Sequence, residues 1–356
     1  MTAVLEIDLD AIAENWRRLD AMHAGATAGV IKADAYGLGA EQVAPKLLAA
    51  GCRHFFVAHL GEALAVRALI PGVLLAALHG LQPGEAAEFS RHGITPVLNS
   101  LREVGLWQAE AKRLGEALPA MLHVDTGMAR LGLPAQELAA LREDAALLEG
   151  LRVDYVMTHL ASSEVPGAPE NQRQTAKFAA VAAQFPGART SIANSSGMFL
   201  GPDFASGLTR PGAALYGLNP MPGRENPMRE VVSLTAPIIQ LHELEPGETV
   251  GYNGTWTAQR RSTIATVGVG YGDGFLRALS NAATARFDAT QVPLVGRVSM
   301  DLTTFDVTGV PAQPGDFLQL IGPGHGPDEL AREAGTNGYE ILTSLGRRYR
   351  RRYIGA

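Results

Sequence analysis

Only four lysines occur in this 356-residue chain, and one of them, Lys32, lies where an amine could be reactive. It follows the apolar run 28–31 and precedes the segment 33–39, Ala-Asp-Ala-Tyr-Gly-Leu-Gly. An amine at the end of a buried strand loses solvation, which favours its neutral, nucleophilic form. Lys32 could therefore form an imine, and a structural ion pair is the alternative.

Polar residues also follow four later apolar runs of the sequence. They are Asp125 with Arg130, His159, Asn194 with Ser195 and Ser196, and Arg210 with Gly212. Ser195 and Gly212 have the chemistry of a phosphate site, because loop N–H groups and a helix N-terminus bind anions. The serines could instead only cap a helix. An imine-forming lysine together with a phosphate site indicates pyridoxal phosphate, which needs both.

These residues need a scaffold that brings strand ends together. Between about residues 26 and 217, apolar runs alternate with amphipathic segments, which predicts a (β/α)₈ TIM barrel rather than an open sheet. Reacting groups of such barrels lie at the C-terminal ends of the strands. The expected strands are 28–32, 54–58, 73–77, 94–98, 120–125, 155–159, 190–193 and 208–216, and the expected helices include 41–50, 101–114, 137–148 and 172–184.

A mostly β second domain is expected after a linker rich in proline and glycine at 219–227. We expect the barrel to span 10–225 and the β domain 226–356, with 1–9 adding a strand to it. The expected strands of this domain are 5–9, 231–241, 262–269, 291–295, 302–307 and 317–320.

Composition excludes several classes of protein. A net charge of −6 gives no reason to expect nucleic acid as a partner. The arginine-rich segment 347–352 is expected to be a solvated terminal strand or tail, with a polyanion site as the alternative. We expect no membrane span and no signal peptide, and the single cysteine, Cys52, fits a reducing compartment, so a cytoplasmic protein is expected. No set of residues has zinc-site spacing, so no metal is expected.

The sequence resembles the alanine racemases, a family of fold-type III pyridoxal-phosphate enzymes, over essentially its whole length. The match at 30–37, Val-Ile-Lys-Ala-Asp-Ala-Tyr-Gly, is the family's cofactor-lysine signature. Further matches lie at 124–132, 158–159, 194–195, 210–217, 250–253, 269–274 and 296–301.

The resemblance implies a homodimer with active sites shared between subunits. Lys32 would hold the cofactor covalently and act as acid and base on the D face, and Tyr252 from the partner subunit would serve the L face. A further backbone contact for the substrate would come from Met300 of the partner subunit. Tyr271 would narrow the substrate entrance.

The remaining implied roles concern the cofactor. Tyr36 and Ser195, with the Gly212 region, would bind its phosphate. The other three would act at the ring and the substrate: Arg130 would contact the phenolic oxygen and the substrate carboxylate, Arg210 would face the pyridine nitrogen, and His159 would bridge Arg210 toward Tyr252.

These roles suit racemisation, which removes a proton on one face and delivers one on the other, and so needs two bases. A tyrosine is a poor base at its free pKa of about 10, so it needs cationic neighbours. An arginine opposite the pyridine nitrogen keeps its own proton. The cofactor would then be a weak electron sink, which disfavours decarboxylation and transamination.

Two positions depart from the family pattern. His123 stands where many members have a lysine, carbamylated in some, that orients the arginine corresponding to Arg130. Arg347 stands near a phosphate-binding tyrosine of some members, and we assign it no role.

The expected function is the interconversion of L- and D-alanine, supplying D-alanine for peptidoglycan. The first alternative is a racemase of serine or of broader specificity. A non-catalytic pyridoxal-phosphate carrier is a second, but such proteins resemble an isolated barrel. A fold-type III decarboxylase is the third, but those enzymes have an acidic residue at the position of Arg210.

Overall fold

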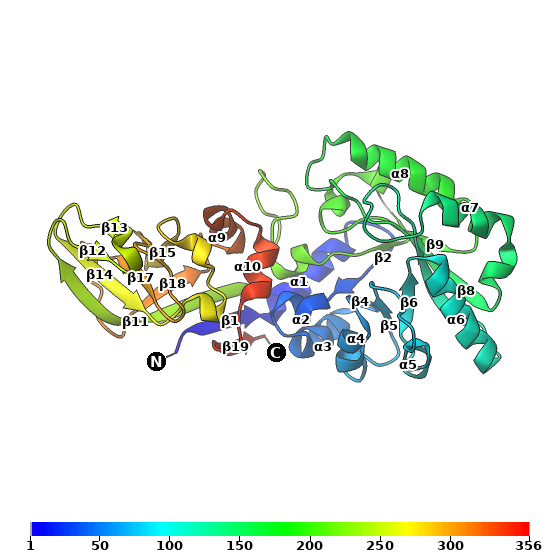
Figure 1. Cartoon of the computed structure of the whole chain (residues 1–356), viewed down its shortest axis with the longest axis horizontal. Coiled ribbons are helices and arrows are strands. Elements are labelled where there is room, and N and C mark those ends of the chain that lie inside the picture. Colours follow the sequence, from blue (N-terminus) through cyan, green and yellow to red (C-terminus); the bar gives the residue numbers. More distant parts are fainter. Residues whose placement is uncertain (1, 205, 356) are drawn as a thin grey trace.

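The computed structural model describes residues 2–204 and 206–355. Strands surrounded by helices form one part of the molecule, and a β-rich part lies beside it (Figure 1). The fold class expected from the sequence, an α/β barrel followed by a mostly β domain, is confirmed.

Seven parallel strands lie side by side in chain order in the first part. They are β3 (Gly29–Val30), β4 (His54–Val57), β5 (Leu74–Ala77), β6 (Thr95–Leu98), β7 (Leu118–His123), β8 (Leu151–Met157) and β9 (Arg189–Ser191). An eighth position is filled by β10 (Leu208–Thr209), which pairs in parallel with β2 (Ala26–Thr27) just before β3. A parallel bridge between Asn194 and Arg210 joins the β9 end to β10 and completes the ring.

Helices cover the outside of this ring, as expected for crossovers between parallel strands. They are α1 (Leu9–Asp20), α3 (Ala40–Ala50), α4 (Leu60–Arg67), α5 (Ala86–Arg91), α6 (Leu101–Leu114), α7 (Ala135–Glu143) and α8 (Pro169–Ala182). The bounds of α6 match the prediction because its end signals are strong. The Ser100 side chain accepts from Glu103 N, and Gly115 ends the helix at a φ of 71°.

The β-rich part is built on the long strand β11 (Val232–Leu244), which pairs antiparallel with the N-terminal strand β1 (Val4–Asp8). β1 also pairs in parallel with β19 (Arg350–Ile354), so both ends of the chain lie in one sheet. The arginine-rich segment thus ends in a strand. The other strands are β12 (Thr249–Val250), β13 (Trp256–Thr257), β14 (Ser262–Val267), β15 (Thr284–Phe287), β16 (Thr290–Pro293), β17 (Thr303–Asp306) and β18 (Phe317–Ile321).

Three local expectations were wrong. The segment 208–216 is a strand only over Leu208–Thr209, because Pro211 has no N–H group for a ladder, and Ala213–Tyr216 forms a 3₁₀ turn, η4. The helix expected at 137–148 is α7 followed by a separate 3₁₀ turn, Ala145–Leu148. Lys32 does not close a strand but begins α2 (Lys32–Tyr36).

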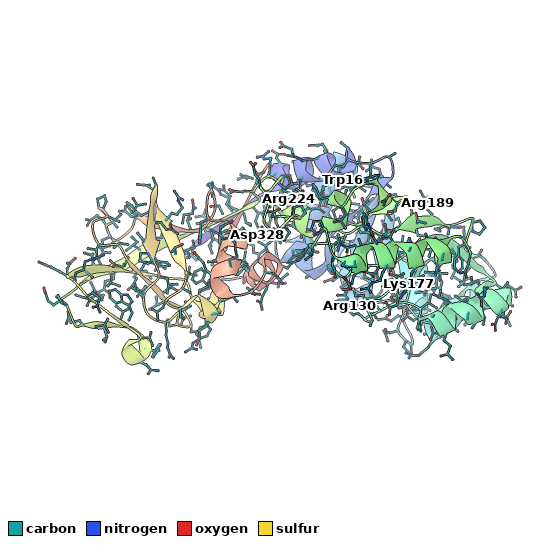
Figure 2. The ribbon with its side chains drawn as sticks, turned by 90° about the horizontal axis from the view of Figure 1, so that it is seen from above. Trp16, Arg130, Lys177, Arg189, Arg224 and Asp328 are labelled. Carbon is teal, nitrogen blue, oxygen red and sulfur yellow. The ribbon has the colours of Figure 1, made fainter. Side chains whose placement is uncertain are left out.

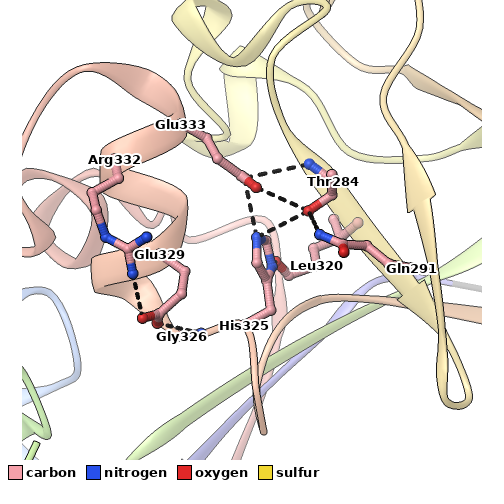
Figure 3. A network of polar contacts seen from close by, with 8 residues as sticks. All are labelled: Thr284, Gln291, Leu320, His325, Gly326, Glu329, Arg332 and Glu333. Atoms are coloured by element: carbon pink, nitrogen blue, oxygen red, sulfur yellow. Dashed lines mark hydrogen bonds and ion pairs between the residues drawn. The ribbon is translucent and has the colours of Figure 1, made fainter. Parts of the chain in front are cut away.

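Two helices in the β-rich part were missed, α9 (Pro327–Ala334) and α10 (Gly338–Ser344). The buried side chain of His325 fixes α9 (Figure 3). Its Nε2 lies 3.0 Å from Glu333 Oε2 on α9. The other oxygen of Glu333 accepts from Thr284 Oγ1 on β15 at 2.9 Å, so this network has a structural role.

Within residues 2–204 and 206–355, no helix is long and apolar enough to cross a bilayer. In the same ranges, no group of three or more His, Cys, Asp or Glu side chains is arranged to hold a metal ion.

Candidate active site

A cavity of about 610 Å³ opens at the C-terminal ends of the barrel strands. All seven residues expected to contact the cofactor line it: Lys32, Tyr36, Arg130, His159, Ser195, Arg210 and Gly212. Figure 2 shows Arg130 on the barrel part, with Asp328 across the junction in the β-rich part. The fold therefore brings together residues that are up to 180 positions apart in the chain.

Lys32 begins a left-handed turn, which is rare for residues with a side chain. Ala33, Asp34, Ala35 and Tyr36 have φ values between 51° and 57°. Each L-residue in this conformation costs roughly 1–2 kcal/mol, so the surroundings must hold the turn. Glu62 contributes, because its Oε1 accepts from Ala33 N at 2.7 Å.

The Lys32 amine is placed to lose its proton. Burial lowers its pKa, and the positive charge of Arg130 lowers it further, while Glu62 partly opposes the change. A lower pKa increases the fraction of neutral amine, which is the nucleophilic form.

Arg210 is buried beneath the cavity and held by oxygen atoms of the barrel. Its Nη2 donates to the Thr158 carbonyl at 2.6 Å, and its Nη1 donates to Ser191 Oγ. Burial lowers the pKa of Arg210 to about 10, so the guanidinium stays charged at neutral pH. Burial, with the charge of Arg210, lowers the pKa of His159 well below its ordinary value. His159 is therefore a neutral imidazole beside a fixed cation.

Backbone N–H groups and hydroxyls gather at the start of η4. Ser195 Oγ accepts from Gly212 N at 3.0 Å and from Ala214 N at 3.2 Å. The ring of Tyr36 packs on that of Tyr216, with centroids 4.7 Å apart, and the Tyr216 hydroxyl donates to the Val30 carbonyl at 2.9 Å. This end of the cavity is suited to an anionic group such as phosphate.

His123 does not take over the role of the family lysine, because its side chain bonds to Asn99 rather than to Arg130. Its Nδ1 lies 2.7 Å from Asn99 Oδ1. Burial and the charge of Arg210 lower the pKa of His123 to about 4, so the ring is neutral at neutral pH. Within the described residues, Arg130 has no hydrogen bond or ion pair, so its guanidinium is available to a bound molecule.

Three expected site residues do not line this cavity. Tyr252, Tyr271 and Met300 belong to the β-rich part, and their exposed fractions are 70%, 42% and 55%. Tyr252 follows β12, which lies at the end of the β-rich part remote from the barrel (Figure 1). A single chain thus does not bring Lys32 and Tyr252 together.

Among the cavity residues that were not foreseen are Tyr339 and Thr343 on α10. The Tyr339 hydroxyl donates at 3.1 Å to Oε1 of Glu164, which lies in the loop after β8. The N-cap signal of α10 is present in the sequence, because the Asn337 side chain accepts from Glu340 N. The packing of this helix against the barrel left no sequence signal.

Comparisons with known proteins cover nearly the whole chain. Residues 7–220 match the family described as "Alanine racemase, N-terminal domain", and residues 231–353 match "Alanine racemase, C-terminal domain". The chain is 56% identical to the alanine racemase of Acidiphilium cryptum, over 98% of this chain and 97% of that protein. It is 51% identical to that of Rhodospirillum rubrum, over 99% and 96%.

The chain belongs to the alanine racemase family. Solved racemase structures agree with this assignment. That of Bartonella henselae, with covalently bound pyridoxal phosphate, has a TM-score of 0.96, 40% identity, and coverage of 99% of this chain and 100% of that one. The biosynthetic alanine racemase of Pseudomonas aeruginosa has a TM-score of 0.93 and 32% identity, covering 99% of both chains.

As an alanine racemase, the enzyme uses pyridoxal phosphate, and its cavity fits that cofactor. A lysine amine with a lowered pKa, an anion site at η4 and a buried guanidinium line one space of suitable size. The amine suits the aldehyde of the cofactor, the anion site suits its phosphate, and the guanidinium suits its ring.

Proposed function

We propose that this alanine racemase moves the α-proton with two bases, Lys32 on one face of the substrate and Tyr252 of a second copy on the other. The observation that carries the proposal is the separation of the two residues. The Lys32 amine has a lowered pKa within the cavity, whereas Tyr252 is 70% exposed in the β-rich part. A tyrosine that is exposed and remote from the cavity of its own chain is suited to serve the cavity of a second copy.

The cofactor, when bound, supplies the electron-withdrawing ring that makes the α-proton of alanine acidic enough to remove. Lys32 would hold it covalently and would exchange a proton at Nζ. Tyr36, Ser195 and the Gly212 backbone would bind its phosphate. Ser195 Oγ already accepts from Gly212 N, which fixes the start of η4 for this task.

Arg130 binds the substrate carboxylate, and its guanidinium has no competing partner among the described residues. Arg210 would face the pyridine nitrogen. It is charged at neutral pH and its Nη2 donates to a carbonyl, so it has no proton to share with the ring. His159 is neutral and near the charge of Arg210. It bridges Arg210 toward Tyr252 of the second copy.

The active form is a homodimer with two shared sites. Tyr252, Tyr271 and Met300 are large, partly apolar side chains at the surface of one part of the molecule, and dimer formation would cover them. In the dimer, Tyr271 narrows the entrance of the neighbouring site, and Met300 offers a backbone contact to the substrate.

The proposal extends to the domain boundary, the use of the product and the place of action. The barrel domain ends at residue 225 and the β domain begins at 226, in the interval between the two family matches, which end at 220 and begin at 231. The D-alanine product serves peptidoglycan synthesis. The enzyme acts in the cytoplasm, since its single cysteine, Cys52, is buried and free.

Reduction with borohydride tests the assignment of Lys32. The wild-type protein should retain the cofactor irreversibly after reduction, with the adduct on the tryptic peptide that contains Lys32. Lys32→Ala should bind the cofactor only reversibly and lose alanine racemisation. An adduct on Lys46, Lys112 or Lys177 would contradict the proposal.

A further inference from the structure

One arginine joins the two loops that carry Tyr271 and Met300. We infer that Arg348 is a positioning residue, which holds these loops as one rigid unit for use by the active site of a second copy. The inference rests on the shared-site proposal above, and it gives a role to a residue of the arginine-rich segment that the reaction otherwise leaves unused.

The Arg348 guanidinium binds two carboxylates at once. Its Nε lies 2.9 Å from Asp273 Oδ1, and its Nη2 lies 2.8 Å from Asp301 Oδ1. Asp273 follows Tyr271 by two residues, and Asp301 follows Met300 directly. Because the guanidinium is planar and rigid, fixing both carboxylates also fixes the distance between the two loops.

Backbone contacts join the same loops beneath the arginine. Tyr271 N donates to the Ser299 carbonyl at 3.0 Å, and Gly272 N donates to the Met300 carbonyl at 2.8 Å. Position 272 must be small, because a Cβ atom there would lie 2.8 Å from Arg348 Nη1 and 2.9 Å from the Met300 carbonyl oxygen. Arg348 therefore lies directly over the point where the loops meet.

Asp273 is the buried member of this cluster, with a side chain only 5% exposed. Its Oδ2 accepts from Gly270 N at 2.9 Å, and its carbonyl accepts from Gly346 N at 2.8 Å. It thus anchors both the Tyr271 turn and the segment that carries Arg348. The Arg348–Asp301 pair is half-exposed, so its value for overall stability is small and its main effect is on loop position.

Loss of the clamp should act on substrate binding more than on proton transfer. The Met300 backbone and the Tyr271 side chain are the groups it fixes, whereas Lys32, Tyr252 and the phosphate site lie on other segments. Arg348→Gln should therefore raise KM for alanine about fivefold, the effect of losing one ordinary hydrogen bond, with a smaller change in kcat. Asp301→Asn should raise KM in the same direction, and the double variant should be no worse than Arg348→Gln alone.

Arg352→Gln is a matched control from the same segment. Arg352 donates through Nε to Glu6 Oε2 on β1 at 2.6 Å and not to a residue of either loop. This variant loses one arginine and one ion pair, yet KM should stay within twofold of wild type. Equal KM values for Arg348→Gln and wild type would overturn the inference, and melting temperatures of all variants would identify a folding defect.

A hybrid dimer shows on which copy Arg348 acts. Co-expression of Lys32→Ala and Arg348→Gln chains with different affinity tags yields a dimer in which one site pairs an intact Lys32 with an intact Arg348 from the other copy. That hybrid should show the wild-type KM at about half the wild-type rate. A KM as high as that of the Arg348→Gln homodimer would mean that Arg348 acts on the active site of its own chain, and would overturn the inference. Racemase activity of the wild type would still support the proposed function in that case.

Discussion

The Tyr36 hydroxyl lies against the backbone of Gly212, so closely that a Cβ atom at position 212 would collide with it. Both residues are proposed to bind the phosphate. Gly212→Ala should displace the Tyr36 ring at a cost of about 1–3 kcal/mol, which corresponds to roughly fivefold to 150-fold weaker cofactor binding. Titration of the apoprotein with pyridoxal phosphate measures this change.

The matched control is Gly105→Ala. Gly105 lies in α6 with no atom within 4 Å of an added Cβ. This substitution should leave cofactor affinity unchanged and stabilise the helix by about 0.5–1 kcal/mol, because alanine is the better helix former. An unchanged affinity in Gly212→Ala as well would argue against a phosphate site at η4.

Tyr252→Phe should affect the two enantiomers unequally. If Tyr252 serves the L face, exchange of the α-proton of L-alanine with deuterated solvent should fall by about 10²–10⁴, the usual contribution of a positioned base. Exchange from D-alanine should fall much less, because Lys32 is intact. Equal losses for both enantiomers, measured by NMR, would contradict the two-face assignment.

A mixture of two inactive variants should regain activity. In a co-expressed Lys32→Ala and Tyr252→Phe hybrid, one of the two shared sites contains both Lys32 and Tyr252. Chiral chromatography should find about half the wild-type rate, since one site of two is intact. A hybrid as inactive as its parents would mean that both residues act within one chain.

His123 should make the enzyme sensitive to mild acid. Its pKa is lowered from 6.5 to about 4 in the folded protein, so the folded state binds fewer protons between these values. Its contribution to stability is fully present above pH 6.5 and is lost as the pH falls to about 4. The loss amounts to about 3 kcal/mol.

His123→Gln removes this contribution and keeps a donor for Asn99. The free energy of unfolding in urea should therefore fall less between pH 7 and pH 4.5 in the variant than in the wild type. Parallel pH dependences would show that protonation of His123 is not coupled to folding.

The sequence predicted the barrel because its signals are local and repeated. Ser100 and Gly115 define the ends of α6, and apolar runs such as β4 lie at regular intervals along the chain. Lys32, His159 and Arg210 could be singled out because polar residues after buried strands must meet at one end of a barrel.

Other features depend on contacts that have no local signal. Ala33 and Ala35 favour right-handed helix by type, and only the fold around them imposes positive φ values. The contribution of Tyr339 to the cavity depends on how α10 packs against the barrel. The bond between His123 and Asn99 joins the ends of β7 and β6, so it depends on strand alignment across the ring.

The left-handed turn after Lys32 should make activity more sensitive to heat than the rest of the structure. Four consecutive residues, 33–36, hold a conformation that the isolated peptide would not keep, and the amine belongs to Lys32, the residue directly before them. Warming should therefore release this short stretch while most of the helices and strands are still intact. Racemase activity should disappear several degrees below the temperature at which circular dichroism records the collapse of the protein.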